Sequence, residues 1–278
     1  MYYLFYLGKY LALILPRDFC YRIAKFLAII QFYFSRKDRA SVIYNLSVIL
    51  EDKEKVKHYA REVFINFAYY LVDFFRYSKL NADFIKRYVT VSGIDNLDAF
   101  LKKDKGALVV TAHLGNYELA GAVTSLLGYN VYAIALPHKN KLLNNFFNTQ
   151  RKLVGINILP ANIAVRKCFS LLRQGELVAF LGDRDFFGGG LATEMFSRQA
   201  ILPRGPAFFA LKTDAVFIPA FFVRENRKFY RLIFEKPILK EAAGLRTEED
   251  IIIYYAKLLE QYIRKYPGQW YMFEKYWL

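Results

Sequence analysis

Apolar residues recur along this chain with two different spacings, and each spacing predicts its own kind of element. In residues 53–77 they return every three or four positions, as at Val56, Ala60, Val63 and Phe67. This period places them on one side of a helix and is typical of an amphipathic helix packed on a core. We therefore expect a long helix here, before a different pattern begins at residue 88.

From residue 88 onward, short apolar runs with β-branched residues alternate with helical patterns. The predicted strands are 89–92, 107–112, 131–136, 156–159, 177–181, 215–223 and 230–234. The predicted helices lie near 117–127, 141–154, 161–174, 204–213 and 248–265. Strands that alternate with helices are typical of a parallel or mixed sheet covered on both faces. The predicted fold class is therefore α/β, with a mostly parallel or mixed central sheet flanked by helices.

The amino-terminal segment differs from the rest because it is apolar, aromatic and basic together. Residues 1–15 are almost wholly apolar but are interrupted by Lys9, and they are short for a membrane-spanning helix. They also lack the charged start and cleavage site of a signal peptide. We expect residues 1–40 to be helices that lie on a membrane surface or dip into it, and residues 41–278 to be the α/β domain. The alternative is an ordinary buried helical pair.

The composition of the chain limits the kinds of partner that the protein can bind. The chain has 40 basic and 25 acidic residues, with 26 Phe and 22 Tyr. Such a protein can bind nucleic acid, an anionic membrane or an acidic partner. No nucleic-acid-binding module is recognisable, so we expect no nucleic-acid partner. Cys20 and Cys168 have the context of small core residues, and three dispersed histidines lack the spacing of metal ligands, so we expect neither a disulfide framework nor a metal.

The first candidate chemistry follows the run 107–112. His113 stands at the carboxyl end of this predicted strand, where open α/β sheets bind ligands. Asn116 stands where the cap of the next helix is expected, and Glu118 falls in that helix's first turn. If the chain doubles back at Gly115, the Glu118 carboxylate can accept the proton of one imidazole nitrogen and leave the other free as a base. We predict that His113 is a general base oriented by Glu118.

Two further groups of charged residues follow other predicted elements. Asp183, Arg184 and Asp185 come directly after the strand 177–181 and suit a clamp on a phosphate or a sugar hydroxyl. Arg204 lies in the first turn of a predicted helix, where charge and helix dipole together favour an anion. Both groups are interpreted as substrate-binding.

Between the His113 motif and the group at 183–185 lies a long stretch whose charged residues are all basic. No acidic residue occurs between Glu118 and Glu176. The basic residues in that span are Lys139, Lys141, Arg151, Lys152, Arg166, Lys167 and Arg173. Such a stretch beside a candidate site points to an anionic substrate or carrier, although a solvated face is the alternative.

In their order and spacing, several blocks of the chain resemble the lipid A biosynthesis acyltransferases, the lauroyl/myristoyl transferase family within the His-x₄-Asp/Glu membrane acyltransferases. The blocks are the apolar amino-terminal segment, Arg39…Asn45-Leu46, His113-Leu-Gly-Asn-Tyr-Glu118, Asp183-Arg-Asp185, Arg204-Gly-Pro-Ala…Ile218-Pro219 and Tyr266-Pro-Gly-Gln-Trp270. Together they cover nearly the whole chain.

The resemblance implies transfer of a fatty acyl chain from acyl carrier protein or coenzyme A to a hydroxyl of a phosphorylated glycolipid, at the cytoplasmic face of the inner membrane. His113 and Glu118 would be the catalytic pair, with no cofactor beyond the acyl donor. Arg151, four positions before Gly155, matches the family arginine near the site. The residues predicted to bind substrate are Asn116, Arg151, Asp183, Arg184, Asp185 and Arg204.

Other functions remain open at this point. A glycerophosphate or lysophospholipid acyltransferase would share the His motif, but its Glu-Gly-Thr-Arg block is absent here. A glycolipid acyltransferase outside lipid A synthesis fits the same residues. From a different class, a non-catalytic basic module that binds a membrane or a carrier protein also fits the composition.

Overall fold

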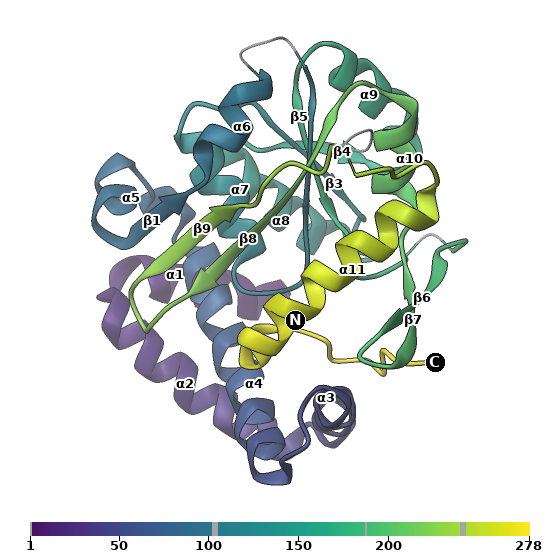
Figure 1. Ribbon diagram of the computed structural model, residues 1–278. Helices are drawn as coiled ribbons and strands as arrows, with labels where there is room; N and C mark the ends of the chain where they lie inside the picture. Colours follow the sequence, from purple (N-terminus) through teal and green to yellow (C-terminus); the bar gives the residue numbers. More distant parts are fainter. Residues whose placement is uncertain (1, 102–104, 187, 240–242) are drawn as a thin grey trace.

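One mixed sheet forms the centre of the computed structural model, which describes residues 2–101, 105–186, 188–239 and 243–278 (Figure 1). Within these residues the sheet has seven strands in the order β1-β9-β8-β2-β5-β3-β4. They are β1 (Val89–Ser92), β2 (Ala107–Thr111), β3 (Val131–Ala135), β4 (Asn157–Pro160), β5 (Leu177–Leu181), β8 (Val216–Arg224) and β9 (Tyr230–Phe234). All neighbours are parallel except β8 and β9, which are antiparallel. The predicted mostly parallel α/β sheet is confirmed.

The central strand β2 explains why the buried strands could be recognised from sequence. Its residues alternate between two core clusters: Leu108 and Val110 belong to one, and Ala107 and Val109 to the other. Because both faces of the strand are covered, the sequence reads as a continuous apolar run rather than an alternating one.

Helices cover both faces of this sheet. Buried residues of α6 (Ile94–Leu101), α7 (Tyr117–Leu126) and α8 (Lys141–Leu153) belong to one cluster. Those of α9 (Ala161–Arg173), α10 (Gly205–Lys212) and α11 (Glu248–Lys265) belong to the other. The remaining short elements are α5 (Ala82–Tyr88) and the 3₁₀ turns η1 (Tyr77–Lys79) and η2 (Pro267–Gln269).

A two-stranded hairpin of β6 (Leu191–Met195) and β7 (Arg198–Leu202) lies outside the main sheet and was not predicted. Its turn is Phe196-Ser197, and both residues have a left-handed backbone, with φ of 49° and 56°. Hairpin turns of this kind usually carry Asn or Gly, so the sequence lacks the expected signal.

Four helices at the amino end pack together at the bottom of Figure 1. They are α1 (Tyr2–Ile14), α2 (Arg17–Phe34), α3 (Arg36–Ile49) and α4 (Lys53–Phe75). The expected helical character of the first segment is confirmed, and the expected domain boundary at residue 40 falls inside α3. Across the described chain, no helix combines the length and the apolar character needed to cross a bilayer.

The helix α2 has two distinct sides. Tyr21, Ala24 and Ala28 are buried in the main core, whereas Phe26 and Leu27 are 64% and 56% exposed. One side of residues 2–34 therefore belongs to the core of the α/β domain, and the other side is exposed.

Candidate active site

The register of two parallel strands brings a histidine and an aspartate together. Thr111, at the end of β2, pairs with Leu181, at the end of β5. His113 and Asp183 each follow two positions later, so both emerge at the same edge of the sheet. The backbone N–H of Gly182 also donates to the carbonyl of Thr111 at 2.7 Å, which keeps the two strand ends together beyond the ladder.

Asp183 contacts the histidine twice. One carboxylate oxygen lies 2.8 Å from His113 Nδ1, and the other accepts the His113 backbone N–H at 2.9 Å. The indole N–H of Trp270 donates to this second oxygen at 3.3 Å. Burial raises the pKa of Asp183, but the charge and hydrogen bonds of His113 outweigh it, so its pKa lies below the ordinary value of 3.8. An ionised Asp183 accepts the Nδ1 proton and leaves Nε2 of His113 free to accept a proton.

The predicted partner of this histidine is therefore wrong. Glu118 instead binds Arg151 of α8, with Arg151 Nε 3.0 and 3.1 Å from the two carboxylate oxygens and Nη2 also in contact. Both side chains are largely buried, at 11% and 12% exposure. Burial acts to lower the pKa of Arg151, but the charge and hydrogen bonds of Glu118 outweigh it. The pKa of Arg151 therefore lies above its ordinary value. Arg151 lines the same cavity as His113, where it neutralises Glu118.

The turn between β2 and α7 depends on Gly115. Its φ is +66°, and a Cβ built on it would lie 2.0 Å from the carbonyl oxygen of Phe222 in β8. Only glycine allows the chain to double back this close to the neighbouring strand. Asn116 then caps α7 by accepting the Leu119 N–H at 3.1 Å, as predicted. Asn116 is buried and lies outside the cavity lining, so its predicted role in substrate binding gives way to a structural one.

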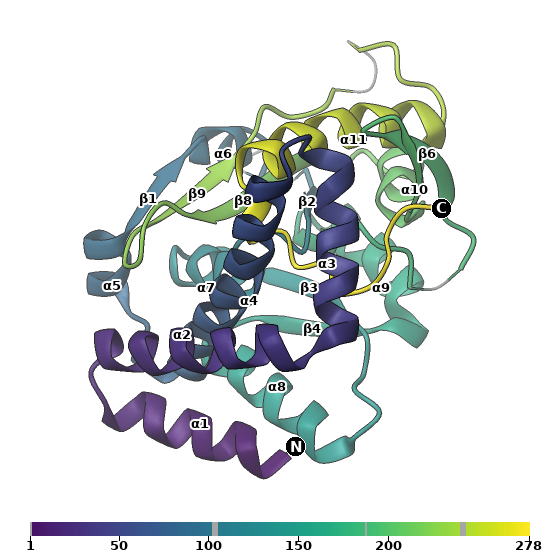
Figure 2. The same ribbon diagram turned by 90° about the horizontal axis from the view of Figure 1, so that it is seen from below.

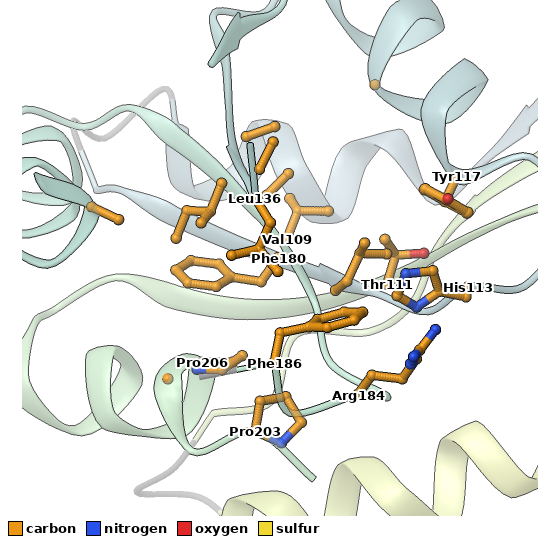
Figure 3. Close-up of a pocket in the computed structure, with 18 of the residues that line it drawn as sticks. Val109, Thr111, His113, Tyr117, Leu136, Phe180, Arg184, Phe186, Pro203 and Pro206 are labelled. Atoms are coloured by element: carbon orange, nitrogen blue, oxygen red, sulfur yellow. The ribbon is translucent and has the colours of Figure 1, made fainter. Parts of the chain in front are cut away.

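A cavity of about 590 Å³ opens at this edge of the sheet (Figure 3). His113, Glu118 and Arg151 line it together with many small and apolar side chains. One part lies over the face of the sheet that α7 covers, lined by residues such as Val109, Gly121, Ala133, Ile158 and Leu232. Its volume is within the range of ordinary ligand pockets, and its walls are mainly apolar.

The other part of the cavity lies toward α9 and α10, and the remaining predicted site residues are here. Arg184 and Phe186 line it beside His113 (Figure 3), with the guanidinium carbon 4.5 Å from the centre of the Phe186 ring. Asp185 also lines it and accepts the Gly190 N–H at 2.7 Å. Arg204 lines its outer part and is 53% exposed. These side chains share one cavity with His113, as expected of a substrate clamp.

One hydroxyl in the cavity lacks a partner. Thr111 Oγ1 is buried and makes no hydrogen bond within the described part of the chain. Thr111 lines the cavity and lies next to His113 in Figure 3. A buried polar atom is costly when unpaired, so this hydroxyl is a candidate contact for a polar atom of the substrate.

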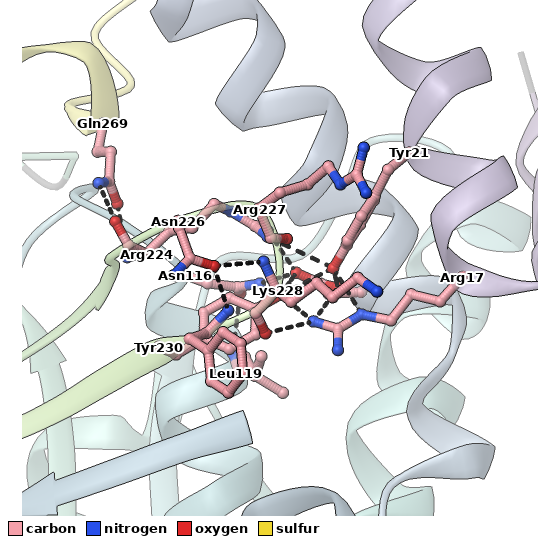
Figure 4. Close-up of polar contacts among 12 residues, drawn as sticks. Arg17, Tyr21, Asn116, Leu119, Arg224, Asn226, Arg227, Lys228, Tyr230 and Gln269 are labelled. Carbon is pink, nitrogen blue, oxygen red and sulfur yellow. Dashed lines mark hydrogen bonds and ion pairs between the residues drawn. The ribbon is translucent and has the colours of Figure 1, made fainter. Parts of the chain in front are cut away.

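A buried network behind the site ties the turn to the amino-terminal helices (Figure 4). Asp73 of α4 accepts from Arg224 at 2.7 Å, from Tyr230 at 2.5 Å and from Asn116 at 3.1 Å. Tyr21 of α2 also donates to Asp73. The cap of α7 is thus held by a buried polar network whose other members lie on α2, α4, β8 and β9.

Comparison with known proteins identifies a family for this chain. A model of the bacterial lipid A biosynthesis acyltransferase family matches residues 1–278. The chain belongs to this family. The resemblance found in the sequence is therefore confirmed.

Individual relatives of this lipid A acyltransferase family member are distant. The phosphatidylinositol mannoside acyltransferase of Mycobacterium tuberculosis is 27% identical over 192 residues, which are 68% of this chain and 60% of that protein. The lipid A biosynthesis palmitoleoyltransferase of Escherichia coli is 25% identical over 190 residues, 67% of this chain and 60% of that protein. The chain thus matches about 60% of the length of these relatives. The crystal structure of the 1-acyl-sn-glycerophosphate acyltransferase PlsC from Thermotoga maritima matches 90% of this chain and 99% of its own, with 16% identity and a TM-score of 0.44.

In this lipid A acyltransferase family member, sequence reasoning missed Asp183 as the partner of His113. A signal was present, because His113 and Asp183 each lie within two positions of the end of an apolar run, 107–112 and 177–181 respectively. Using it would have required knowing that β2 and β5 are neighbours.

Proposed function

We propose that the protein is an O-acyltransferase that moves a fatty acyl chain from a thioester to a hydroxyl of a glycolipid. One observation carries the proposal: the His113–Asp183 pair opens into a largely apolar cavity at the carboxyl edge of a parallel sheet. A base of this kind suits activation of a hydroxyl, and an apolar cavity suits an acyl chain.

The chemistry follows from the two nitrogens of the imidazole. Nε2 of His113 takes the proton of the acceptor hydroxyl as its oxygen bonds to the thioester carbonyl carbon. Asp183 holds Nδ1–H and stabilises the imidazolium that forms. The carbon–sulfur bond then breaks, and the imidazolium returns the proton to the leaving thiolate. The products are the new ester and a free thiol, so protons balance and no cofactor is required.

The oxyanion formed in this step needs donors. The unpartnered hydroxyl of Thr111 lies next to His113 and is one candidate. A hydroxyl that is already in position can stabilise the oxyanion at little energetic cost, because it need not reorient when the charge develops.

Charge at the cavity suits an anionic substrate. Arg184 and Arg204 line the part toward α10, and each is paired with one carboxylate, Glu274 and Glu248 respectively. Both partners are themselves on the surface or near it, so a phosphate can compete for the guanidinium groups. We propose that these arginines hold the phosphate or sugar end of the acceptor or of the donor.

The donor is proposed to be acyl carrier protein or coenzyme A. Of the seven basic residues between Glu118 and Glu176, all but Arg151 are exposed. Arg166 of α9 directly follows Ala164 and Val165, which line the cavity. An exposed basic surface beside the cavity would attract either an acidic carrier or the phosphates of coenzyme A.

The membrane is the proposed location, at the cytoplasmic face of the inner membrane. The helices α1 and α2 lie side by side (Figure 2). Their exposed large apolar residues are Tyr3, Leu4, Tyr6, Leu7, Tyr10, Leu11, Ile14, Phe19, Ile23, Phe26, Leu27, Ile30, Tyr33 and Phe34. Arg22 and Lys25 are exposed on the same helices. Exposed aromatic residues with adjacent basic ones suit insertion into the headgroup layer of an anionic bilayer.

The test is a transfer assay with purified protein. Acyl carrier protein and coenzyme A thioesters are each offered with a lipid A precursor, a mannosylated phosphatidylinositol or lysophosphatidate, and products are identified by mass spectrometry. We expect an acylated glycolipid, and His113→Ala should lower its rate by about 10²–10⁴-fold. His58→Ala is the control, because His58 is exposed on α4 away from the cavity.

Three results would overturn the proposal. Acylation of lysophosphatidate alone would favour a glycerophospholipid acyltransferase. Equal rates for wild type and His113→Ala would show that His113 is not the base. Binding of vesicles and carrier without any product would favour a non-catalytic module.

A further inference from the structure

The segment 268–272 lies directly behind the catalytic pair, although it is far from both members in sequence. Trp270 is 2% exposed, and its indole N–H donates to the Asp183 oxygen that also accepts the His113 backbone N–H. No other described side chain besides His113 and Trp270 has a hydrogen bond to Asp183. The position of this carboxylate is therefore set by the histidine on one side and by the indole on the other.

The backbone of the same segment holds the histidine turn. The Tyr271 N–H donates to the carbonyl of His113 at 2.8 Å, and the Gly115 N–H donates to the carbonyl of Gln269 at 2.8 Å. Between them, Leu114 and Trp270 form an antiparallel bridge. Residues 268–272 therefore pair with the turn as a short strand would, and they fix the backbone from which the imidazole projects.

Both ends of the segment are anchored. The Gln269 side chain accepts from the Arg224 N–H at 2.9 Å and donates to the Arg224 carbonyl at 2.8 Å, which fastens it to β8 (Figure 4). Asn66 of α4 donates to the carbonyl of Gly268 at 2.9 Å, and buried Asn45 of α3 donates to that of Met272 at 3.1 Å. The amino-terminal helices and β8 thus hold the segment in place.

We propose that residues 268–272 are a positioning strap for the His113–Asp183 pair, and that Trp270 is its positioning residue. The proposal rests on the proposed function. Trp270 does not line the cavity and touches no reacting atom. It acts through Asp183, because the indole N–H and the two backbone bonds to the turn restrict where the carboxylate and the imidazole meet. A phenyl ring would fill most of the same space but would leave the Asp183 oxygen that the indole contacts with the His113 backbone N–H as its one donor.

The chain offers a matched control. Trp277 is also a buried indole in the same aromatic cluster, with its ring centre 6.0 Å from that of Trp270. Its N–H donates to the backbone carbonyl of Asn45 at 3.2 Å, not to Asp183. Trp270→Phe and Trp277→Phe therefore remove equivalent packing and one buried hydrogen bond each, and only the first removes a bond to the catalytic pair.

The experiment compares kcat and KM for wild type, Trp270→Phe and Trp277→Phe, together with their melting temperatures. We expect kcat to fall about tenfold in Trp270→Phe, because one hydrogen bond to a charged group is lost, with KM changed less than about twofold. Trp277→Phe should lower the melting temperature by a similar amount and leave kcat near that of wild type. Equal losses of kcat in both variants, or a change confined to KM, would overturn the proposal.

A second readout does not depend on activity. The chain has three histidines, so the imidazole N–H resonance of His113 can be assigned by its loss in His113→Ala. Trp270→Phe should shift or broaden this resonance, whereas Trp277→Phe should preserve it. If the resonance is the same in all three proteins, the strap does not position the pair. Absence of acyl transfer by the wild type with every substrate would instead overturn the proposed function.

A third variant covers the case in which Trp270→Phe does not fold. Asn45→Ala removes the anchor at Met272 from α3, together with the Asn45 bonds to the backbone of Glu274 and Tyr276. It should broaden the His113 resonance and lower kcat without changing KM. A folded Asn45→Ala protein with the wild-type resonance and kcat would contradict the proposal.

Discussion

Two carboxylates compete for the role of partner to His113, and the structure separates them by what each one contacts. Asp183 bonds the imidazole, and Glu118 bonds Arg151. We expect Asp183→Asn to lower kcat by about 10²–10⁴-fold, because an amide can present the wrong group to Nδ1 and stabilises no imidazolium. Glu118→Gln should cost less kcat and act mainly on KM, since it frees a cavity arginine. Steady-state kinetics of both variants measure this, and a larger kcat loss in Glu118→Gln would restore the originally predicted pair.

The buried Asp183 carboxylate also links stability to pH. Its pKa in the folded protein lies below 3.8, the ordinary value. A lowered pKa stabilises the folded state above about pH 4, and this contribution is lost as pH falls through the folded-state pKa. The free energy of unfolding of wild type should therefore exceed that of Asp183→Asn near pH 6, and the gap should narrow toward pH 3. Urea titrations at several pH values measure the gap. If the difference in unfolding free energy between wild type and Asp183→Asn widens on acidification, the expected direction of the pH dependence is wrong.

Gly115 gives a further test at single-residue scale. In Gly115→Ala the new methyl group meets the Phe222 carbonyl, so the turn must move away from β8. We expect a loss of several kcal/mol of stability or misplacement of His113, beyond the ~1–2 kcal/mol of left-handed strain alone. Gly128→Ala is the control, because Gly128 also has positive φ but a Cβ there meets nothing within 4 Å. Equal effects of the two changes would show that contact with β8 is unimportant.

At the scale of elements, the positions of the buried strands in the sequence were predicted well, but the order in which the strands pair in the sheet was not. Strands such as β5 are covered on both faces, so their apolar runs are unbroken and their ends are sharp. The hairpin β6–β7 was missed because its turn uses Phe196-Ser197 rather than glycine. The order of strands in the sheet has no local signature, which is why His113 was identified and Asp183 was given another role.

The network around Asp73 links elements that are remote in sequence, and its charge balance predicts a large effect. Arg224 is buried, and Asp73 is the carboxylate that it pairs with. Asp73→Asn should cost about 3–5 kcal/mol of unfolding free energy, because it leaves a buried arginine unpaired. Asp18→Asn is the control: its pairs with Arg227 and Lys228 are on the surface, so the unfolding free energy should change little. Chemical denaturation measures both. Similar small losses would mean that Arg224 is hydrated.

For the whole molecule, the exposed side of α1 and α2 predicts how the protein meets a bilayer. Phe26 and Leu27 project from α2 while its opposite side packs in the core. Replacing both with Ser should weaken partition onto anionic vesicles about tenfold or more, because two apolar side chains no longer leave water. Replacing exposed Ile253 and Tyr254 of α11 with Ser is the control. Vesicle sedimentation measures the difference, and equal binding by both double variants would place the membrane contact elsewhere.

The sequence separation of the proposed catalytic pair also has a consequence for how the molecule folds. His113 and Asp183 are 70 positions apart, and Trp270 lies a further 87 positions beyond Asp183. Contacts between residues this far apart in sequence form slowly, because a long loop must close before the contact can stabilise the chain. Helices can therefore appear early in refolding while no working site yet exists. Recovery of acyl transfer should lag behind recovery of helical circular dichroism, so enzyme activity would report the last stage of assembly.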